Sequence, residues 1–324
     1  MPLIKDSQFD KNPYFIRHGH LETILPSLFR EIEGITYQRE RIDTPDDDFL
    51  DLDWLKNGND KLLILSHGLE GSSDRHYVKS CAKYFHERGW DILAWNYRTC
   101  SGEMNRQLRM YHHGVTDDLE TVILHALQTN SYEHTALCGF SMGGSTTLKY
   151  LGEQGGQALV QISAAAVFSV PCNLWNSAEQ LVKWDNAFYK HRFLRKMKKK
   201  IIEKAALHPD KIDITNIEKI KHFDEFDRRY TAPIHGFKDA QDFYVSSSSD
   251  QFYHNIKVPA LIANALNDPM LGDKCYPTSL AQENENLYLE TPKYGGHVGF
   301  SIKGKAHSWM DERAFEFINE QITK

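Results

Sequence analysis

Short apolar runs and amphipathic segments of helical length alternate along the first half of this chain. The apolar runs at residues 61–66, 91–98 and 135–140 predict buried strands, and the segments at 74–88 and 116–128 predict helices. Strands separated by helices of this length join as right-handed βαβ units. The pattern therefore predicts a parallel sheet with helices packed on its faces.

The same alternation returns in the second half of the chain. Apolar runs at residues 164–170, 259–266 and 287–290 predict three further strands, and residues 311–322 have the spacing of a closing amphipathic helix. Together the two halves indicate an α/β protein with a mostly parallel central sheet that is flanked by helices.

Residues 171–257 interrupt this alternation with helical, aromatic and charged sequence. We expect one catalytic domain, formed by residues 1–170 and 258–324, and a helical lid or cap formed by the insertion. An insertion between two core strands lies at the carboxyl edge of the sheet, where open α/β folds bind their ligands. Most of its aromatic side chains are expected to form the lid's own core, and a minority to face a substrate.

A basic run, Arg-Lys-Met-Lys-Lys-Lys, occupies residues 195–200 within this insertion. Consecutive charges of one sign usually mark a solvated helix face, and this is the interpretation that we favour. Contact with an anionic lipid or an acyl carrier is the alternative.

Composition and charge narrow the class of partner. A chain of 324 residues with 41% hydrophobic residues is large enough for one α/β domain with an insertion. Its formal net charge is -6, so no overall positive field attracts nucleic acid or an anionic membrane. We therefore expect no nucleic-acid partner.

The chain shows no pattern that is typical of export or of membrane insertion. Residues 1–10 lack the basic and then apolar order of a signal peptide, and no apolar run approaches the roughly 18 residues of a membrane span. Five cysteines, an odd number without a C-x-x-C pair, favour reduced thiols over a disulfide framework. We expect a cytoplasmic protein without a transmembrane segment.

A serine stands between glycines where an apolar run gives way to a helical one. Gly139-Phe140-Ser141-Met142-Gly143 follows the strand predicted at 135–140 and precedes helical sequence at 145–151. Alone, this five-residue G-x-S-x-G pattern is equally compatible with an ordinary turn. Between a strand and a helix it predicts a nucleophile elbow, in which Ser141 is exposed on a sharp turn.

A serine hydroxyl is a weak nucleophile, so a base must take its proton and an acid must orient that base. Asp268 directly follows the strand predicted at 259–266, and His297 follows the strand predicted at 287–290. This order of serine, acid and histidine is that of α/β-hydrolases. Asp273 and His307 are the alternatives, although Asp273 lies past the turn and His307 at the expected start of the last helix.

Acyl transfer also needs two backbone N–H groups that stabilise an oxyanion. Met142 is expected to supply one, because it follows the nucleophile at the start of a helix. The second is expected from Leu69, in the loop that follows the strand predicted at 61–66, where Gly68 allows a close approach of the backbone. Arg98 and Asn96, at the end of another strand, are expected to brace loops.

Motifs for other mechanisms are missing from the sequence. It contains no H-E-x-x-H, no G-x-x-x-x-G-K-[ST] and no G-x-G-x-x-G after a strand. The histidine pairs His18/His20 and His112/His113 lack partner ligands at metal-binding spacing. We expect neither a cofactor nor a metal.

With these motifs the chain resembles the α/β-hydrolase superfamily, and more narrowly the YheT-like branch, of AB hydrolase 4 type, which includes the eukaryotic lung and embryogenesis-associated hydrolases. The resemblance covers almost the whole chain. It rests on residues 19–24 (Gly-His-Leu-Glu-Thr-Ile), 67–71 (His-Gly-Leu-Glu-Gly), 96–102, 111–114, 139–144, 267–269 and 295–300.

The resemblance implies a serine hydrolase of carboxylic esters, acting on short- to medium-chain acyl esters or lipids through an acyl-enzyme. Ser141 would be the nucleophile, His297 the base and Asp268 the residue that orients it. An acyltransferase that passes the acyl group to an alcohol or thiol would use the same residues and stays open. A non-catalytic binding protein of the same fold is a further alternative, although such proteins usually lose a triad residue.

Overall fold

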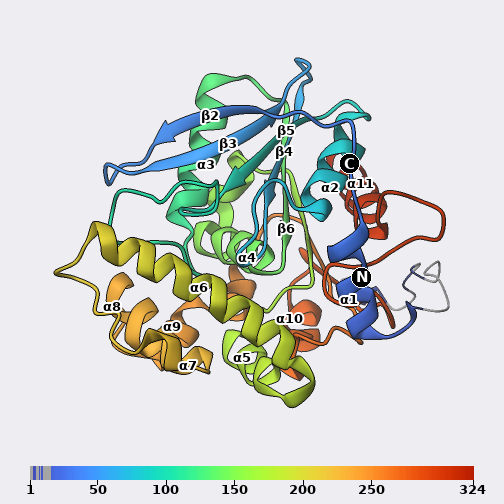
Figure 1. Cartoon of the computed structure of the whole chain (residues 1–324). Coiled ribbons are helices and arrows are strands. Elements are labelled where there is room, and N and C mark those ends of the chain that lie inside the picture. The colour runs from blue at the N-terminus through green and yellow to red at the C-terminus, as the bar shows by residue number, and fades with distance from the viewer. Residues whose placement is uncertain (1–2, 5–6, 8, 10–15) are drawn as a thin grey trace.

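The computed structural model describes residues 3–4, 7, 9 and 16–324, so the interpretation of residues 1–10 as lacking a signal peptide lies partly outside the described residues. Within the described part, the strands form one nine-stranded sheet in the order β1-β9-β8-β7-β6-β4-β5-β3-β2 (Figure 1). The strands are β1 (Leu3–Ile4), β2 (Gln38–Asp43), β3 (Phe49–Leu55), β4 (Lys61–Ser66), β5 (Asp91–Asn96), β6 (His134–Phe140), β7 (Ala164–Phe168), β8 (Ala260–Ala263) and β9 (Leu287–Glu290).

All neighbouring strands pair in parallel except at the β2 edge, where β3 is antiparallel to both β2 and β5. The helices are α1 (Gly19–Phe29), α2 (His76–His86), α3 (Asp117–Thr129), α4 (Met142–Gln154), α5 (Leu174–Val182), α6 (Ala187–Leu207), α7 (Phe223–Phe226), α8 (Ala232–His235), α9 (Ala240–Ser247), α10 (Thr278–Glu283) and α11 (Trp309–Ile322). The predicted fold class, a mostly parallel sheet flanked by helices, is confirmed.

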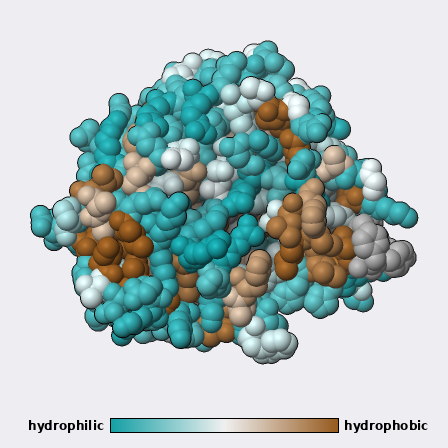
Figure 2. Space-filling view, in the orientation of Figure 1, coloured by the Kyte–Doolittle hydropathy of each residue, from teal (hydrophilic) through white to brown (hydrophobic). Residues whose placement is uncertain are grey.

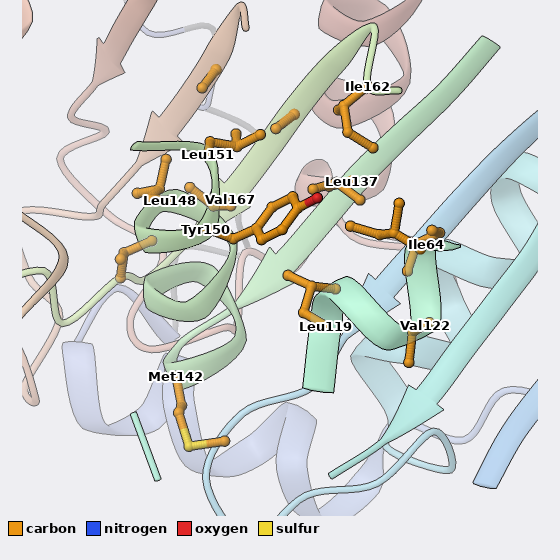
Figure 3. Close-up of a cluster of buried hydrophobic side chains, with 14 of the residues drawn as sticks. Ile64, Leu119, Val122, Leu137, Met142, Leu148, Tyr150, Leu151, Ile162 and Val167 are labelled. Carbon is orange, nitrogen blue, oxygen red and sulfur yellow. The ribbon is translucent and has the colours of Figure 1, made fainter. Parts of the chain in front are cut away.

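Two hydrophobic layers hold the helices against the sheet, because alternate residues of each strand point to opposite faces. Leu62 and Ile64 of β4 face the layer beneath α3 and α4, whereas Leu63 and Leu65 face the layer beneath α2 and α11. Figure 3 shows the first layer, in which Ile64, Leu119, Val122, Leu137, Leu148, Tyr150 and Leu151 come together. Both faces of the central strands are therefore buried.

The bounds of β4 and β9 match the predicted runs, and the other predicted strands are found with shifted ends. The last helix begins at Trp309 with Ser308 as its capping residue, so the expectation that His307 starts this helix is wrong. Ser308 accepts from the backbone of Asp311 while Asp311 accepts from the backbone of Ser308, a reciprocal cap that fixes the start.

The hairpin of β2 and β3 is missing from the sequence prediction. Asp51 and Asp53 interrupt the apolar pattern of β3, yet both side chains are buried in the structure. Arg41 and Arg39, opposite them on β2, each form a bidentate pair with their aspartate at 2.7–2.9 Å. Cross-strand ion pairs thus replace the apolar contacts that a sequence pattern can detect.

The segment between β7 and β8 contains α5 to α9 and lies beside the carboxyl ends of the strands (Figure 1). Apolar side chains of α6, α7 and the segments around them form a cluster of their own, which includes Leu194, Ile201, Ile217, Phe223 and Phe226. No helix in the described ranges is long and apolar enough to cross a bilayer. All five cysteines are free and buried.

Candidate active site

Ser141 occupies the turn between β6 and α4 with φ at +53°, a strained conformation for a residue with a side chain. A Cβ at Gly143 would lie 2.2 Å from the carbonyl oxygen of Ser66, and a Cβ at Gly139 would lie 2.5 Å from the carbonyl oxygen of Gly143. Both positions of the G-x-S-x-G pattern therefore require glycine. The tight turn presents the serine side chain at the carboxyl edge of the sheet.

The three side chains selected from the sequence form one hydrogen-bonded chain. Ser141 Oγ lies 2.9 Å from His297 Nε2, and His297 Nδ1 lies 2.8 and 3.1 Å from the two carboxylate oxygens of Asp268. Because the carboxylate can only accept, Nδ1 carries the proton and Nε2 is left to accept from the serine hydroxyl. This tautomer is the one that can remove the proton of Ser141.

Helix α1 holds the loops that carry the acid and the histidine. The N–H of His297 donates to Thr23 Oγ1 at 2.8 Å, and Asn267, next to Asp268, donates to Glu22 Oε2 at 2.5 Å. A Cβ at Gly19 would lie 2.0 Å from the carbonyl oxygen of Asn267, so the helix packs directly on this loop. Sequence reasoning gave these residues no role, although the motif at 19–24 was the signal that could have found them.

The alternative acid and base are bound elsewhere. Asp273 accepts a hydrogen bond from the side-chain amide of Asn176 at 3.0 Å, and His307 Nε2 lies 2.9 Å from Glu312. Neither side chain lines a pocket that reaches Ser141. The structure brings Asp268 and His297 to Ser141 and leaves the alternatives apart.

The two N–H groups expected to stabilise an oxyanion are near the serine and have no acceptor. A Cβ at Gly68 would lie 3.1 Å from Ser141 Cβ, which places the loop containing Leu69 beside Ser141. Among the hydrogen bonds of the described residues, neither the N–H of Leu69 nor that of Met142 donates to another atom. Both donors are therefore available to a developing negative charge.

His67 helps to fix this loop. Its Nδ1 donates to the carbonyl oxygen of Gly68 at 2.8 Å, and its Nε2 accepts from the N–H of Tyr97 at 3.3 Å. Complete burial lowers the pKa of His67 to about 3, so the ring stays neutral near pH 7 and keeps this tautomer. Because His67 is fixed on both sides, it serves as a support and not as a proton carrier.

A profile of the family described as serine aminopeptidase, S33, matches residues 57–272, which is more than half of the chain. The chain belongs to this α/β-hydrolase family. The putative esterase YheT of Escherichia coli (strain K12) is 32% identical over 311 residues, covering 94% of this chain and 91% of the relative. Membership of the YheT-like branch, which the sequence motifs indicate, is thereby confirmed. The prediction that the chain is an enzyme is confirmed as well.

Eukaryotic proteins of the same branch are also similar to this hydrolase. Phospholipase ABHD3 of Homo sapiens is 28% identical and matches 94% of this chain and 77% of the relative. Embryogenesis-associated protein EMB8 of Picea glauca is 29% identical and matches 94% of this chain and 70% of the relative. Among solved structures, the Pyrococcus furiosus esterase Pf2001 shares the fold, with a TM-score of 0.60 at 18% identity over 90% of this chain and 98% of that one.

The basic run on α6 is not a uniformly solvated face, and that expectation is wrong for three of its lysines. Lys198 donates to the backbone carbonyls of Glu218 and Ile220. Lys196 donates to the backbone carbonyl of Glu70 at 3.1 Å, and Lys200 lies 3.1 Å from the carboxylate of Glu70. Residues four apart share one helix face, so this pair faces the hydrolase core while Arg195 and Lys199 are exposed. In a run of consecutive charges, the sequence does not show which side chains contact the protein and which are exposed.

The carboxylate of Glu70 links α6 to the loop beside Ser141. Besides Lys200, it accepts from the hydroxyl of Tyr111 at 2.5 Å, while the N–H of Glu70 donates to the same hydroxyl oxygen at 3.1 Å. The loop is fixed by these contacts even though Glu70 has φ at +55°. Arg98, in contrast, pairs with Asp46, Asp48 and Asp118 and braces loops, as expected.

Two pockets meet at Ser141 and His297. The first, which we call the apolar pocket, encloses about 1030 Å³ including its mouth, and the second, the polar pocket, about 810 Å³. The lining of the apolar pocket includes Met110, Leu174, Leu181, Phe193, Met197, Ile201, Phe223, Phe226, Ile234, Phe243, Tyr244 and Leu271. The lining of the polar pocket combines the polar and charged residues Thr23, Ser27, Glu70, Arg75, His76, Tyr77, Tyr189, Arg192 and Lys196 with the apolar residues Ile24, Leu69, Phe188, Phe193, Met270 and Val298.

Asp227 is a buried carboxyl in the lining of the apolar pocket. It accepts from Thr231 Oγ1 at 2.6 Å and from the hydroxyl of Tyr244 at 2.7 Å. Burial raises the pKa of Asp227 from 3.8 to about 6. The side chain is therefore neutral in mild acid and becomes a buried negative charge as the pH rises.

We expect Asp227→Asn to stabilise the hydrolase at pH 8 but not at pH 4. The folded pKa lies above the unfolded one, so the native state binds this proton more tightly and loses stability as the pH rises through about 6. The difference corresponds to about 3 kcal/mol in the free energy of unfolding at pH 8. Urea unfolding of both proteins at the two pH values measures it.

Asp210→Asn is the matched control, because Asp210 is an exposed aspartate in the turn after α6, within the same segment between β7 and β8. Its effect on the free energy of unfolding should be small at both pH values. A stabilisation by Asp227→Asn that is equal at pH 4 and pH 8 would contradict the raised pKa.

The described residues contain no group of three or more histidine, cysteine, aspartate or glutamate side chains that is arranged to hold a metal ion. His112, one of the histidines considered as a ligand, instead packs its ring on His235, Phe237 and Phe243.

Proposed function

We propose that this hydrolase cleaves carboxylic esters, with Ser141 as nucleophile, His297 as general base and Asp268 as the residue that orients His297. The hydrogen-bonded chain from Ser141 Oγ through His297 to Asp268 is the observation that carries this proposal. Relatives whose names describe an esterase, a phospholipase and a monoacylglycerol lipase support ester chemistry.

In the acylation step, Ser141 Oγ attacks the ester carbonyl carbon while His297 Nε2 takes the hydroxyl proton. The carbonyl oxygen becomes an oxyanion, which the N–H groups of Leu69 and Met142 stabilise. The C–O bond to the alcohol then breaks, and the imidazolium of His297 gives its proton to the leaving alkoxide. An acyl-enzyme on Ser141 and a free alcohol result.

Water completes the reaction by the same steps. His297 removes a proton from water as its oxygen attacks the acyl carbon, and the second oxyanion is held by the same two N–H groups. Its collapse releases the carboxylic acid and returns the proton to Ser141 Oγ. Asp268 remains ionised throughout and stabilises the imidazolium in both halves of the cycle.

We further propose that residues 171–257 act as a lid on a catalytic domain formed by residues 1–170 and 258–324. Side chains from α5 to α9 supply much of the apolar pocket, whose volume and lining suit an acyl chain of short to medium length. Phe193, Phe243 and Tyr244 are aromatic residues of this segment that line it.

A panel of aryl esters of one phenol with acyl chains from acetate to decanoate tests this function. We expect kcat/KM to rise from acetate toward medium chains, because each added CH₂ buries apolar surface worth about 0.8 kcal/mol when fully enclosed. Lack of turnover with every ester would contradict the proposed reaction. Fastest turnover of acetate would contradict the assignment of the apolar pocket to the acyl chain.

A further inference from the structure

The polar pocket lies between α1, the start of α2 and the first half of α6, and it reaches Ser141 beside the apolar pocket, with which it shares Leu69, Glu70, Phe193 and Met270. Figure 2 shows hydrophilic surface along the front of the molecule, where α6 runs, and hydrophobic surface to the right, on the side of α1. Three cationic side chains line this pocket: Arg75, Arg192 and Lys196.

These three cations have no carboxylate partner within 4 Å in the part of the chain that the structure describes. Arg75 and Lys196 both donate to one neutral acceptor, the backbone carbonyl of Glu70, at 2.8 and 3.1 Å. Arg192 and Lys196 are four residues apart on α6 and therefore share the face that lines the pocket. Three cations thus share one carboxylate, that of Glu70, whose attraction for Lys196 is weaker than the opposing effects of burial and of Arg75.

The single carboxylate in the lining of the polar pocket belongs to Glu70, and it is already engaged by Lys200 and the hydroxyl of Tyr111. Burial, followed by repulsion from Arg75, lowers the pKa values of Arg192 and Lys196. An anion bound between these side chains would relieve that repulsion. His76 and Tyr77, in the first turn of α2, line the same pocket and add the positive end of a helix.

We propose that the polar pocket binds an anionic group, a phosphate or a carboxylate, on the alcohol portion of the ester, while the apolar pocket receives the acyl chain. This inference rests on the proposed ester hydrolysis. An anionic group in the apolar pocket would lose its hydration among aliphatic and aromatic side chains and face Asp227, and Lys200, a lysine of that lining, is already paired with Glu70. In the polar pocket the guanidinium groups present several donors to the anion.

Matched butyrate esters test the inference. The alcohols are glycerol, glycerol 3-phosphate and glycolate, so that the acyl chain is constant and the charge of the alcohol varies; monomethyl succinate places a carboxylate on the acyl side instead. We expect kcat/KM to be about 10- to 100-fold higher for the phosphate ester than for the glycerol ester, which is the range of one or two charge-assisted hydrogen bonds. For monomethyl succinate, we expect no comparable increase in kcat/KM over the glycerol ester.

The double variant Arg192→Gln/Lys196→Gln should reduce this ratio at least about tenfold, since both cations that α6 contributes are removed. Arg195→Gln/Lys199→Gln removes the same charge from exposed positions of the same helix and should leave the ratio unchanged. If the first variant does not fold, salt provides a second measurement: the wild-type ratio should fall as ionic strength rises from about 0.01 to 0.5 M.

The outcomes separate this inference from the proposed function. Turnover of the glycerol ester without preference for an anionic alcohol would overturn the inference and leave the ester hydrolase intact, whereas turnover of none of the esters would overturn the proposed function. A preference for an anionic group on the acyl side of the ester would also overturn the inference about the polar pocket. The soluble phosphate ester and didecanoyl phosphatidate in phosphatidylcholine vesicles distinguish a free anion from a lipid headgroup. Preference for the anionic ester in either form supports the pocket.

Discussion

Replacement of Ser141 by alanine is expected to lower kcat for any ester that the wild type hydrolyses by about 10⁴- to 10⁶-fold. The variant lacks the oxygen that forms the acyl-enzyme, so only the two N–H donors and substrate binding remain. Labelling by a fluorophosphonate probe, which phosphonylates an activated serine, should disappear with the activity. The fold should persist, because the change removes one oxygen at a position that already has φ at +53°.

Ser177→Ala is the matched control for this experiment. Ser177 also lines the apolar pocket, but its hydroxyl is paired with Cys275 and not with a histidine. Its removal should leave probe labelling in place. Labelling of Ser141→Ala at the wild-type rate would show that another residue is the nucleophile and would defeat the assignment.

Replacement of Asp268 by asparagine should lower kcat by about 10⁴-fold with little change in KM. An asparagine can present an N–H to His297 Nδ1, which favours the tautomer whose proton lies on Nε2, facing Ser141. That nitrogen could then no longer accept the serine proton. Steady-state kinetics on one medium-chain ester, together with thermal unfolding to check the fold, measure the effect.

Asp273→Asn is the informative comparison, because Asp273 is the alternative acid in the sequence and hydrogen-bonds to Asn176. We expect its kcat to stay within about threefold of the wild type, as for surface changes in general. Equal losses for the two variants, or a loss confined to Asp273→Asn, would reassign the orienting acid.

Local sequence patterns predicted much of the fold and of the candidate site, because these features depend on residues that are close together in the chain. Buried parallel strands produce uninterrupted apolar runs, and the strain at Ser141 demands glycines at fixed spacing, so both can be found in a few residues. The order of Asp268 and His297 after their strands then follows from the chain path of the fold. These features were predicted, and the structure brings their side chains into one hydrogen-bonded chain.

Structural features that depend on partners far away in the chain could not be predicted from the sequence. Asp51 and Asp53 reduce the apolar character of β3, and only the arginines of β2 make their burial possible. Lys196 and Lys200 are indistinguishable from their exposed neighbours until α6 is placed against Glu70. In each case the partner lies in another element, and no periodicity within the segment reports it.

The clamp between α1 and the loops near the end of the chain has a consequence for the order in which the site is completed. Glu22 and Asn267 are 245 positions apart, and Thr23 and His297 are 274 apart, so these hydrogen bonds close very long loops. Under the proposed mechanism, a growing polypeptide has made its nucleophile, Ser141, long before its base, His297, is synthesised. The proposed hydrolysis therefore becomes possible only once the loop that carries His297 has packed on α1.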